Sequence, residues 1–545
     1  MMKETNPNDE HYGEEIGQVL KPQGVMNDTI AAGGDNDSIA LGAQIAVAKH
    51  KETGFFHALK LYPRAAGWAF FFSLGAIMAS FDPQLITNLY SVHKFQQDFG
   101  YYYDGDYIIS AAWQTGLSMG NPIGQVVGAL FASFPMEWYG RKWTFLACVV
   151  TTTGLVFIQF FAPSLPVLLV GELLSGLVLG TYIVIAPTYA SEVCPTPLRG
   201  VLTSYINLCF VIGQFIANGV TAGTQSRDDK WAYKIPFAIQ WTWPAIIYCF
   251  IWWAPESPYY LVRKGKIEAA EEALQRLASP AVDVKPDLAM IIETDRIEQE
   301  IKAGTSIWDV FRGTNLRRTE IAIGVYTIQV LCGIYLVGYS TYFFEQAGLP
   351  DTQAFNMGIG FLGVGFVGTV CSWFVLPTFG RRTIYLNGLV MCTIILLIIG
   401  ILDCVPNYKE RKGVIWGQSA LMLVWNFFYD LSVGPINFVI ICETSAATLR
   451  GKTIATATAV QAVFGIVMTV AIPYMMNPDQ GNMRGKLGFF FGGLSLLCLV
   501  WGWFRVPETK DRTFEELDIM FDMRLPTRQF KTFNAMEHQS RYKTV

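Results

Sequence analysis

The sequence predicts an all-α membrane protein with twelve transmembrane helices, arranged as two six-helix parallel repeats. Three observations predict this fold: an apolar composition, about twelve apolar stretches of helical length, and charged phrases that occur twice in the same order. Of the 545 residues, 52% are hydrophobic and 15% are charged, whereas a soluble domain carries roughly 25% charged residues. Such a chain satisfies its backbone hydrogen bonds inside a lipid bilayer by forming spanning helices.

The apolar stretches have the length of membrane spans, because a helix needs roughly 20 mostly apolar residues to cross a bilayer. They cover residues 67–90, 108–133, 144–163, 166–190, 200–222, 236–254, 320–343, 355–377, 384–402, 414–441, 453–475 and 487–505. Several of them contain Gly, Pro or a single carboxylate, which is typical of helices that line an interior.

Polar segments divide the chain into five parts. Residues 1–60 have no apolar core of the kind found in a signal peptide, and we expect a disordered cytoplasmic N-terminal tail there. Residues 61–261 form the first six-helix half, and 319–506 form the second. Between them, 262–318 is predicted to be a cytoplasmic linker with short amphipathic helices. Residues 507–545 form a cytoplasmic C-terminal tail.

Three charged phrases occur once in each half. They are GRK at 140–142 and GRR at 380–382, SEVCPTPLRG at 191–200 and CETSAATLRG at 442–451, and PES at 255–257 and PET at 507–509. The members of each pair lie 240, 251 and 252 residues apart, respectively. The same order at nearly one spacing indicates an ancient duplication, and two halves of equal orientation form a parallel repeat.

This topology places the repeated charges together at one face of the membrane. They are Arg141, Glu192, Arg199, Glu256, Arg381, Glu443, Arg450 and Glu508. Opposite charges at a membrane face attract each other more strongly than fully solvated ones. We therefore expect gating salt bridges that hold the two halves together on one side and break when the halves rock. The alternative is that they are loop charges that only orient the chain.

At these phrases the chain resembles the sugar porter family of the major facilitator superfamily, from about Leu61 to Leu517. The set that carries the resemblance is GRK, SEVCPTPLRG, PESPYYLVRKGK, GRR, ETSAATLRGKT and PETKDRTFEEL. The stretches LYPRAAGW, WQTGLSMG, KIPFAIQWTWP and GYSTYFFEQAG are similar to fungal α-glucoside (maltose-type) permeases. The resemblance implies the major facilitator fold, cytoplasmic termini and alternating access to a central sugar site, coupled in many fungal members to protons.

The resemblance also implies sugar contacts in the fifth, seventh, tenth and eleventh spans. The positions are Asn207, Gln214, Gln329, Tyr335, Tyr339, Asn437, Phe438 and Gln461. Amides and aromatic faces suit a sugar, which has many hydroxyl groups and no charge, although a buried amide can also simply join two helices. Val330 stands where the family has a second Gln, and Tyr335 where it usually has Asn. These departures argue against ordinary hexose selectivity and suit a longer or more apolar substrate.

Two carboxylates are the candidates for proton coupling. Asp82 stands where proton-coupled members carry a titrating Asp, and Glu172 stands where many hexose members carry Arg. If their spans pack as in the family, two neighbouring anions in a low dielectric favour holding a proton. The alternative is that Asp82 caps a helix broken beside Pro83. Asp430 is a secondary candidate.

Two further departures weaken the case for symport. Ala79 and Asn121 stand where well-known α-glucoside permeases carry acids, so a facilitator, or an exporter of another small molecule such as a fungal secondary metabolite, stays open. A non-transporting sugar sensor is disfavoured, because such sensors usually have long tails and only 39 residues follow Val506.

The sequence contains no signature of an enzyme. We find no metal-ligand cluster, no nucleophile–base set and no phosphate-binding loop, so neither a metal nor a cofactor is predicted. No basic patch indicates nucleic acid. The expected partners are a sugar, protons and the lipid bilayer, with the protein in the plasma membrane.

Overall fold

The computed structural model describes residues 55–533, except 104–105, 281, 305, 407, 409–410, 447–448, 511 and 513. These residues belong to two compact units. The small unit comprises the chain up to Trp68 with Ser191–Gly200 and Pro255–Ala303. The membrane unit comprises Ala69–Ala190, Val201–Ala254 and the chain from Gly304 onward.

The small unit contains short helices from the N-terminal segment and from the predicted linker. They are α4 (Phe55–Leu61), the start of α5 (Pro63–Phe72), α14 (Pro258–Arg263), α15 (Ile267–Leu277) and α16 (Lys285–Gly304). The Tyr62 hydroxyl donates a hydrogen bond to Asp287 over 2.7 Å, and the Ser279 N–H donates to the Leu61 carbonyl over 2.8 Å. The prediction of disorder throughout 1–60 is therefore wrong for residues 55–60, since the apolar sequence FFHALKL forms α4. Residues 1–54 lie outside the described chain.

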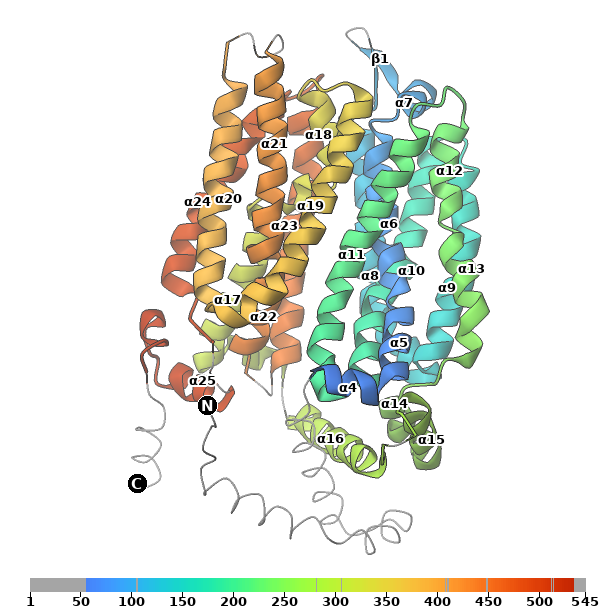
Figure 1. The fold of residues 1–545 in the computed structure, drawn as a ribbon, viewed down its shortest axis with the longest axis vertical. Helices are drawn as coiled ribbons and strands as arrows, with labels where there is room; N and C mark the ends of the chain where they lie inside the picture. Colours follow the sequence, from blue (N-terminus) through green and yellow to red (C-terminus); the bar gives the residue numbers. More distant parts are fainter. Residues whose placement is uncertain are drawn as a thin grey trace, which may run out of the picture. The chain divides into compact units, whose positions relative to one another are not determined.

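The membrane unit is a bundle of long helices that run side by side (Figure 1). The first repeat contains α6 (Leu74–Leu89), α8 (Ala111–Tyr139), α9 (Arg141–Phe160), α10 (Leu165–Val193), α11 (Thr196–Thr224), α12 (Trp231–Ile239) and α13 (Thr242–Phe250). The second contains α17 (Gly313–Leu331), α18 (Ser340–Gln346), α19 (Asp351–Thr378), α20 (Arg381–Asp403), α21 (Lys412–Phe428), α22 (Gly434–Thr444), α23 (Arg450–Met476) and α24 (Leu487–Arg505).

Ten helical segments in the described chain are long and apolar enough to cross a membrane. The other two predicted spans, the second and the fifth, correspond to α8 and α11, each of 29 residues. The twelve-span arrangement predicted from the sequence is thus present in helices of membrane-crossing length.

Two spans of the second repeat are interrupted beside the centre of the bundle. The seventh breaks after α17 at Gly333, whose φ is +107°, and continues through the 3-10 turn η3 (Ile334–Leu336) into α18. The tenth contains a π-helical turn, η5 (Tyr429–Val433), between α21 and α22. Such interruptions inside a membrane are tolerated where the chain is buried in protein or lines a cavity, and π-turns often mark functional sites.

A seam of glycines draws α8 against α10. A Cβ atom on Gly128 would overlap the carbonyl oxygen of Leu177, and one on Gly180 would overlap the carbonyl oxygen of Gln125. About two turns from Gly128, a Cβ on Gly120 would lie 3.1 Å from the Cβ of Glu172. Small residues permit this backbone approach in membranes, and the approach sets the polar face of α8 beside Glu172.

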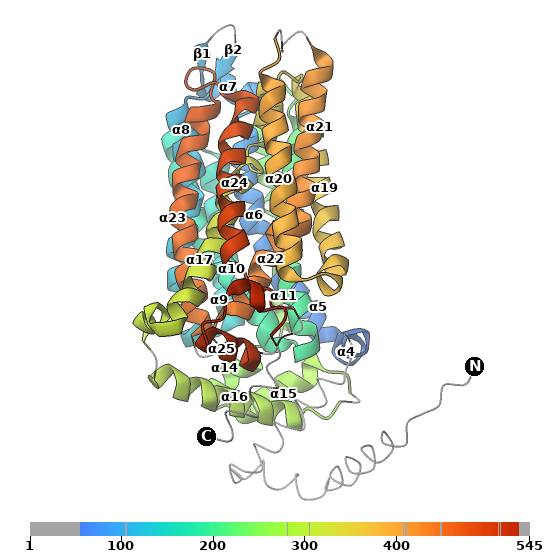
Figure 2. The ribbon, with the colours of Figure 1, turned by 90° about the vertical axis from the view of Figure 1, so that its left-hand side faces the viewer.

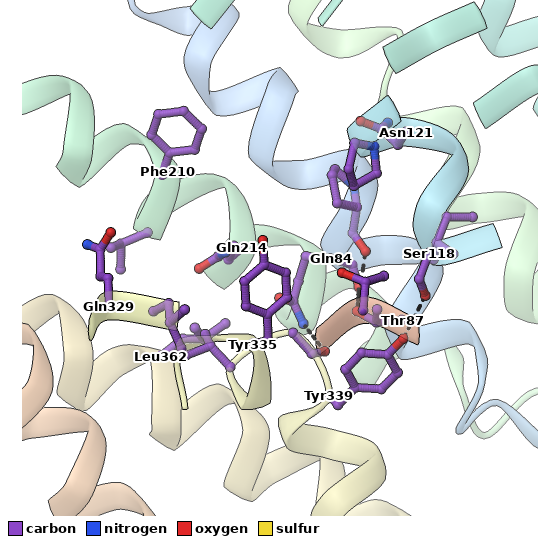
Figure 3. A pocket seen from close by; sticks show the side chains of 18 of the residues that line it. Gln84, Thr87, Ser118, Asn121, Phe210, Gln214, Gln329, Tyr335, Tyr339 and Leu362 are labelled. Atoms are coloured by element: carbon purple, nitrogen blue, oxygen red, sulfur yellow. Dashed lines mark hydrogen bonds between the residues drawn. The ribbon is translucent and has the colours of Figure 1, made fainter. Parts of the chain in front are cut away.

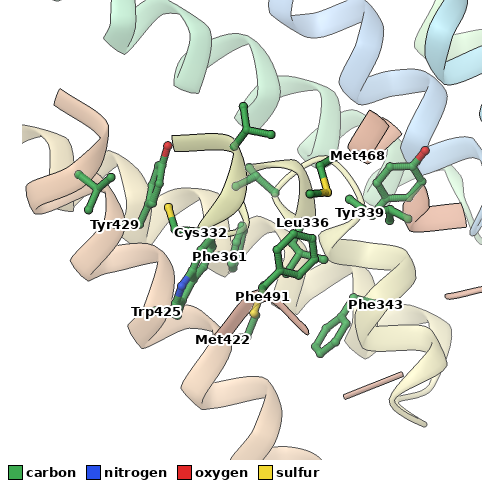
Figure 4. Packing of buried hydrophobic residues seen from close by; sticks show 14 of the residues in the cluster. Cys332, Leu336, Tyr339, Phe343, Phe361, Met422, Trp425, Tyr429, Met468 and Phe491 are labelled. Carbon is green, nitrogen blue, oxygen red and sulfur yellow. The ribbon is translucent and has the colours of Figure 1, made fainter. Parts of the chain in front are cut away.

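Buried apolar side chains pack around the broken seventh span (Figure 4). Trp425 is fully buried and stacks on Tyr429 with 5.4 Å between ring centroids. Cys332, Leu336 and Phe491 belong to the same cluster. This packing fixes η3 and η5 on one wall of the cavity described below.

Smaller elements lie at the two ends of the membrane unit. At one end, α7 (His93–Phe99) precedes β1 (Tyr101–Tyr103), which pairs antiparallel with β2 (Asp106–Ile108); the sequence predicted no strands. At the other end, α25 (Phe514–Asp522) and η7 (Thr527–Gln529) lie beside the start of α17 (Figure 2). The Arg317 guanidinium donates to the Leu525 carbonyl over 2.7 Å and to Thr527 over 3.0 Å, so the C-terminal segment is folded against the second repeat.

Candidate functional site

A cavity of about 510 Å³ lies between the two repeats of the membrane unit. Its volume falls in the range of roughly 300–1,000 Å³ that is usual for small-molecule sites. Side chains from α6, α8, α10 and α11 line one wall, and side chains from α17, η3, α19, η5 and α23 line the other. Figure 3 shows polar groups from both walls that point into it.

Five of the eight predicted sugar contacts line this cavity. They are Gln214, Gln329, Tyr335, Tyr339 and Gln461. Gln461 Nε2 donates to Gln329 Oε1 over 2.7 Å, and Gln329 Nε2 donates to the Gly434 carbonyl over 3.4 Å. The two amides thus form one polar row on the wall of the second repeat.

Two of the other three predicted contacts, Asn437 and Phe438, do not line the cavity. Asn437 is fully buried. Phe438 is 43% exposed and meets Tyr326 edge-on at 5.8 Å, and its role as a sugar contact stays a prediction. The side chain of Asn207 lies outside the described residues.

Polar residues of the first repeat that we did not single out also line the cavity: Gln84, Thr87 and Ser118. The Tyr339 hydroxyl donates to Ser118 Oγ over 2.8 Å, and Gln84 Nε2 donates to the Gly338 carbonyl over 3.2 Å (Figure 3). Both bonds join the first repeat to the broken seventh span. An available signal was the unusual density of amides and hydroxyls in PQLITN and WQTGLSMGN.

The two carboxylates predicted for proton coupling are brought together. Asp82 is 1% exposed and Glu172 is 0% exposed. Gln159 Nε2 donates to Glu172 Oε1 over 2.7 Å and to Asp82 Oδ1 over 3.2 Å, so one amide serves both acids. Helix α6 continues through Pro83. The side-chain hydrogen bonds of Asp82 come from Asn121, Gln159 and Gln240, outside α6, which does not support a local capping role.

Two further amides surround Asp82. Asn121 Nδ2 donates to Asp82 Oδ2 over 2.5 Å, and Gln240 Nε2 donates to Asp82 Oδ1 over 2.8 Å. Glu172 lines the cavity, and its Oε2 accepts no hydrogen bond from the described residues. Two buried anions that share one amide are costly in a low dielectric, so the pair of Asp82 and Glu172 can hold a proton.

Three of the predicted gating charges meet at one end of the second repeat. Arg381 Nη2 lies 3.0 Å from Glu443 Oε1, and the Arg381 backbone N–H donates to Glu508 Oε1 over 2.7 Å. Thr509 Oγ1 donates to Glu443 Oε2 over 2.5 Å. Residues of the three charged phrases of the second repeat, GRR, CETSAATLRG and PET, therefore lie together. The repeat predicts this arrangement for the second half.

The remaining gating charges are placed as follows. In the membrane unit, Arg141 is buried and donates to the Met136 carbonyl over 3.2 Å. In the small unit, Glu192 accepts from the Ser257 hydroxyl over 2.5 Å, and Glu256 accepts from the Ser257 N–H over 2.9 Å. The side chains of Arg199 and Arg450 lie outside the described residues.

A second network joins the repeats at the other end of α23, beside the β1–β2 hairpin. Asn477 Oδ1 accepts from the Tyr342 hydroxyl over 2.6 Å and from Gln114 Nε2 over 2.9 Å, and Asn477 Nδ2 donates to the Ile109 carbonyl over 3.2 Å. The Tyr101 hydroxyl donates to Asp479 over 2.6 Å. Sequence reasoning missed this network, because NPDQGN reads as an ordinary polar loop.

Comparison with known proteins assigns the chain to a family. Residues 68–521 match the family described as "Sugar (and other) transporter". A maltose permease of Saccharomyces cerevisiae is 36% identical over 486 residues, which cover 87% of this chain and 78% of the relative. A general alpha-glucoside permease of the same species is 35% identical over 499 residues, which cover 90% of this chain and 80% of the relative.

Solved structures agree on the fold. The inward-open xylose transporter XylE from E. coli matches with a TM-score of 0.67 at 20% identity, over 84% of this chain and 99% of that one. A structure described as the major facilitator superfamily proton:xylose symporter XylE matches with a TM-score of 0.64. The relatives are permeases, which confirms the prediction of a transporter and not an enzyme. The chain is a multi-pass membrane protein with the major facilitator fold, and it belongs to the sugar (and other) transporter family.

Proposed function

We propose that this protein carries an α-glucoside such as maltose across the plasma membrane by alternating access, together with protons. The observation that carries the proposal is the cavity between the repeats, which is lined by amides, phenols and the carboxyl group of Glu172. Glu172 shares the Gln159 amide with the buried Asp82. The names of the yeast relatives, a maltose permease and a general alpha-glucoside permease, support the choice of sugar.

The polar groups of the cavity suit an uncharged substrate rich in hydroxyl groups. Gln214, Gln329 and Gln461 offer amides, and Tyr335 and Tyr339 offer aromatic faces with a hydroxyl group. A sugar hydroxyl both donates and accepts, as does an amide. The sugar contacts in the second repeat are therefore proposed to come from α17, η3 and α23.

The acid pair supports proton symport. We propose that Asp82 and Glu172 take up one proton from outside and release it inside. Gln159 donates hydrogen bonds to both buried acids, and two negative charges so close together in a low dielectric are costly. Glu172 also lines the cavity, so a proton on the pair and a sugar in the cavity occupy one continuous site.

The two networks at opposite ends of α23 support alternating access. We propose that the Arg381–Glu443 pair belongs to the cytoplasmic gate and that the Asn477 network closes the external one. The helix between them is 27 residues long, about 40 Å, so one gate can open while the other holds.

A facilitator is the second candidate function. Asn121 favours it, since this amide donates to Asp82 at a place where well-known α-glucoside permeases carry an acid. A facilitator would move the same sugar without using the proton gradient.

Uptake of radiolabelled maltose by transporter-null yeast tests the proposal, with and without a protonophore. For the wild-type chain we expect accumulation that the protonophore abolishes, whereas Asp82→Asn should transport downhill only. Asp351→Asn is the matched control, because Asp351 is an exposed acid at the start of α19. Wild-type uptake that is insensitive to the protonophore would establish facilitated transport instead. Absence of uptake, with the protein present at the cell surface, would refute the α-glucoside assignment.

A further inference from the structure

Exposed aromatic side chains gather at the end of the membrane unit opposite the β1–β2 hairpin. They lie at the ends of spanning helices: Trp138 and Tyr139 on α8, Trp143 on α9, Trp252 and Trp253 in η1 (Ile251–Trp253), and Trp503 and Phe504 on α24. Tryptophan and tyrosine are enriched where a membrane protein meets the lipid headgroups, because their rings are apolar and carry one polar group. These side chains therefore mark the level of the headgroups at this end, which is the cytoplasmic one in the proposed orientation.

Two arginines lie against the ring of Trp503. The guanidinium carbon of Arg382, on α20, lies 5.6 Å from the centroid of this ring, and that of Arg528, in η7, also lies 5.6 Å from it. Arg528 is 5.5 Å from the ring centroid of Phe504 as well. Cation–π contacts of this kind hold a guanidinium group beside an aromatic face. Two positive charges are thus held at the level of the headgroups, although like charges repel each other.

Both guanidinium groups keep N–H groups that the described residues do not use. Arg382 donates to the Trp503 carbonyl over 2.6 Å and to the Val506 carbonyl over 2.9 Å, which leaves three of its five N–H groups. Arg528 is exposed and forms no hydrogen bond with the described part of the chain. Neither arginine forms an ion pair within that part. The arrangement therefore favours an anion at the membrane surface.

The lipid-facing surface of α24 continues from this pair of arginines toward the centre of the membrane. Leu497 and Val500 are 67% and 52% exposed, one and two turns before the exposed rings of Trp503 and Phe504. An anion that binds here therefore lies above an apolar surface of the length of a helix. A phospholipid has this combination of a charged headgroup and apolar chains, whereas a free phosphate ion has only the charge.

We propose that Arg528 and Arg382 bind the headgroup of an anionic phospholipid, such as phosphatidylserine, whose acyl chains lie along α24. The inference goes beyond the proposed function, because it does not depend on the cargo. A guanidinium group offers paired N–H donors that match the oxygens of a phosphate group. Phosphatidylserine has a net negative charge that offsets the repulsion between the two arginines, whereas phosphatidylcholine brings a cation of its own.

Such a lipid would fasten the C-terminal segment to the second repeat. Arg528 belongs to η7, which contacts α24, and Arg317 of α17 donates to Leu525 and Thr527 in the same segment. One phosphate group held by α20 and η7 would join the segment to both the protein and the membrane. The folded chain should therefore be more stable with an anionic lipid than with a zwitterionic one.

Titration of short-chain phosphatidylserine or phosphatidylcholine into the purified full-length chain, in an uncharged detergent, tests the proposal. Thermal unfolding at each lipid concentration yields a Kd, because a ligand of the folded state raises the Tm. We expect tighter binding of phosphatidylserine, and Arg528→Gln should raise its Kd about fivefold, the effect of removing one cation near anionic lipid. Arg528→Lys keeps the charge and should retain most of the affinity. Arg227→Gln, which removes an exposed arginine near the hairpin end, should leave both Kd values unchanged.

The exposure of Arg528 means that Arg528→Gln should fold normally, which circular dichroism checks. For the wild-type chain, the Kd for phosphatidylserine should rise with ionic strength, since salt screens the attraction. Equal Kd values for phosphatidylserine in the wild-type chain and Arg528→Gln would overturn the inference, as would equal affinity of the wild-type chain for the two lipids. Equal protection by inorganic phosphate or glycerophosphoserine would assign the site to a soluble anion and overturn the lipid assignment. The test involves no sugar, so its failure would leave the proposed transport function standing.

Discussion

Tyr335 is the residue that most distinguishes this cavity from that of a hexose carrier. It lines the cavity at a position where the family usually has Asn. Its hydroxyl group lies where a Cβ on Gly465 of α23 would be, so α23 leaves room for the ring. An amide that would bind sugar hydroxyls is thus replaced by an aromatic face with a single hydroxyl.

Replacing Tyr335 with Asn should shift the preference of the carrier from maltose toward glucose. The shorter amide restores a donor and an acceptor and removes the aromatic surface against which a second sugar ring could pack. We expect the ratio of kcat/KM for maltose over glucose to fall about tenfold, since single contacts of this kind discriminate by roughly 10- to 200-fold. Competition uptake assays measure it, and Tyr474→Phe, at an exposed tyrosine near the end of α23, is a control. A ratio that does not move would remove Tyr335 from the specificity determinants.

At the scale of the helices, the glycine seam between α8 and α10 sets the geometry of the acid pair. Gly120, Gly124 and Gly128 recur every four residues along α8, and Gly176 and Gly180 do so along α10. The seam puts Asn121 and Glu172 on adjoining surfaces, and from there both reach the surroundings of Asp82. A wider spacing of these helices would separate the carboxylates.

Gly128→Ala should therefore destabilise the protein, although alanine is normally the better helix former. Its Cβ meets the Leu177 carbonyl, and overpacking costs about 1–3 kcal/mol. Gly154→Ala on α9 is the matched control, because a Cβ there has open space and the change stabilises a helix by roughly 0.5–1 kcal/mol. Thermal unfolding in detergent should show Tm changes of opposite sign. Equal behaviour of the two variants would contradict the close packing.

Hydropathy predicted the helices well, and it failed where local geometry decides. Spans with a clear apolar length, such as α20 and α24, follow directly from composition. The strands β1 and β2 and helix α4 are short. Their formation depends on tertiary contacts, which the hydrophobic periodicity of the sequence does not predict. The π-turn at Tyr429–Val433 has no sequence signature either. The resemblance supplied Gln329 and Gln461, whereas Gln84 and Ser118 needed the packed structure.

At the scale of the whole molecule, one side chain, Asn477, forms two of the hydrogen bonds that join the two repeats beside the hairpin, in addition to the bond between Tyr101 and Asp479. Asn477 follows the last residue of α23 and binds groups from both repeats, namely Tyr342, Gln114 and the Ile109 carbonyl. It is fully buried. The closed state at this end therefore depends on a single amide more than on any other group in the network.

Asn477→Ala should open this end of the carrier. The two hydrogen bonds that cross between the repeats, to Gln114 and the Ile109 carbonyl, are lost at roughly 1 kcal/mol each, so the population of the open state should rise at least about tenfold. A cysteine introduced at Thr87, which lines the cavity, reports it through its rate of labelling by an impermeant maleimide. Gln480→Ala is the control, because Gln480 is exposed and its described side-chain bond goes only to its neighbour Asp479. Equal labelling rates in both variants would show that the closure lies elsewhere.

The amides around Asp82 have a mechanical consequence. Asn121, Gln159 and Gln240 come from α8, α9 and the end of α12, and all three offer N–H groups to the same carboxylate. A carboxylate with several lone pairs can serve three such donors, whereas a neutral acid carries a hydrogen of its own that competes with them. Protonation of Asp82 would weaken the hydrogen bonds from all three helices at once, and deprotonation would strengthen them again. The charge state of Asp82 would thus determine how firmly these helices of the first repeat are held together.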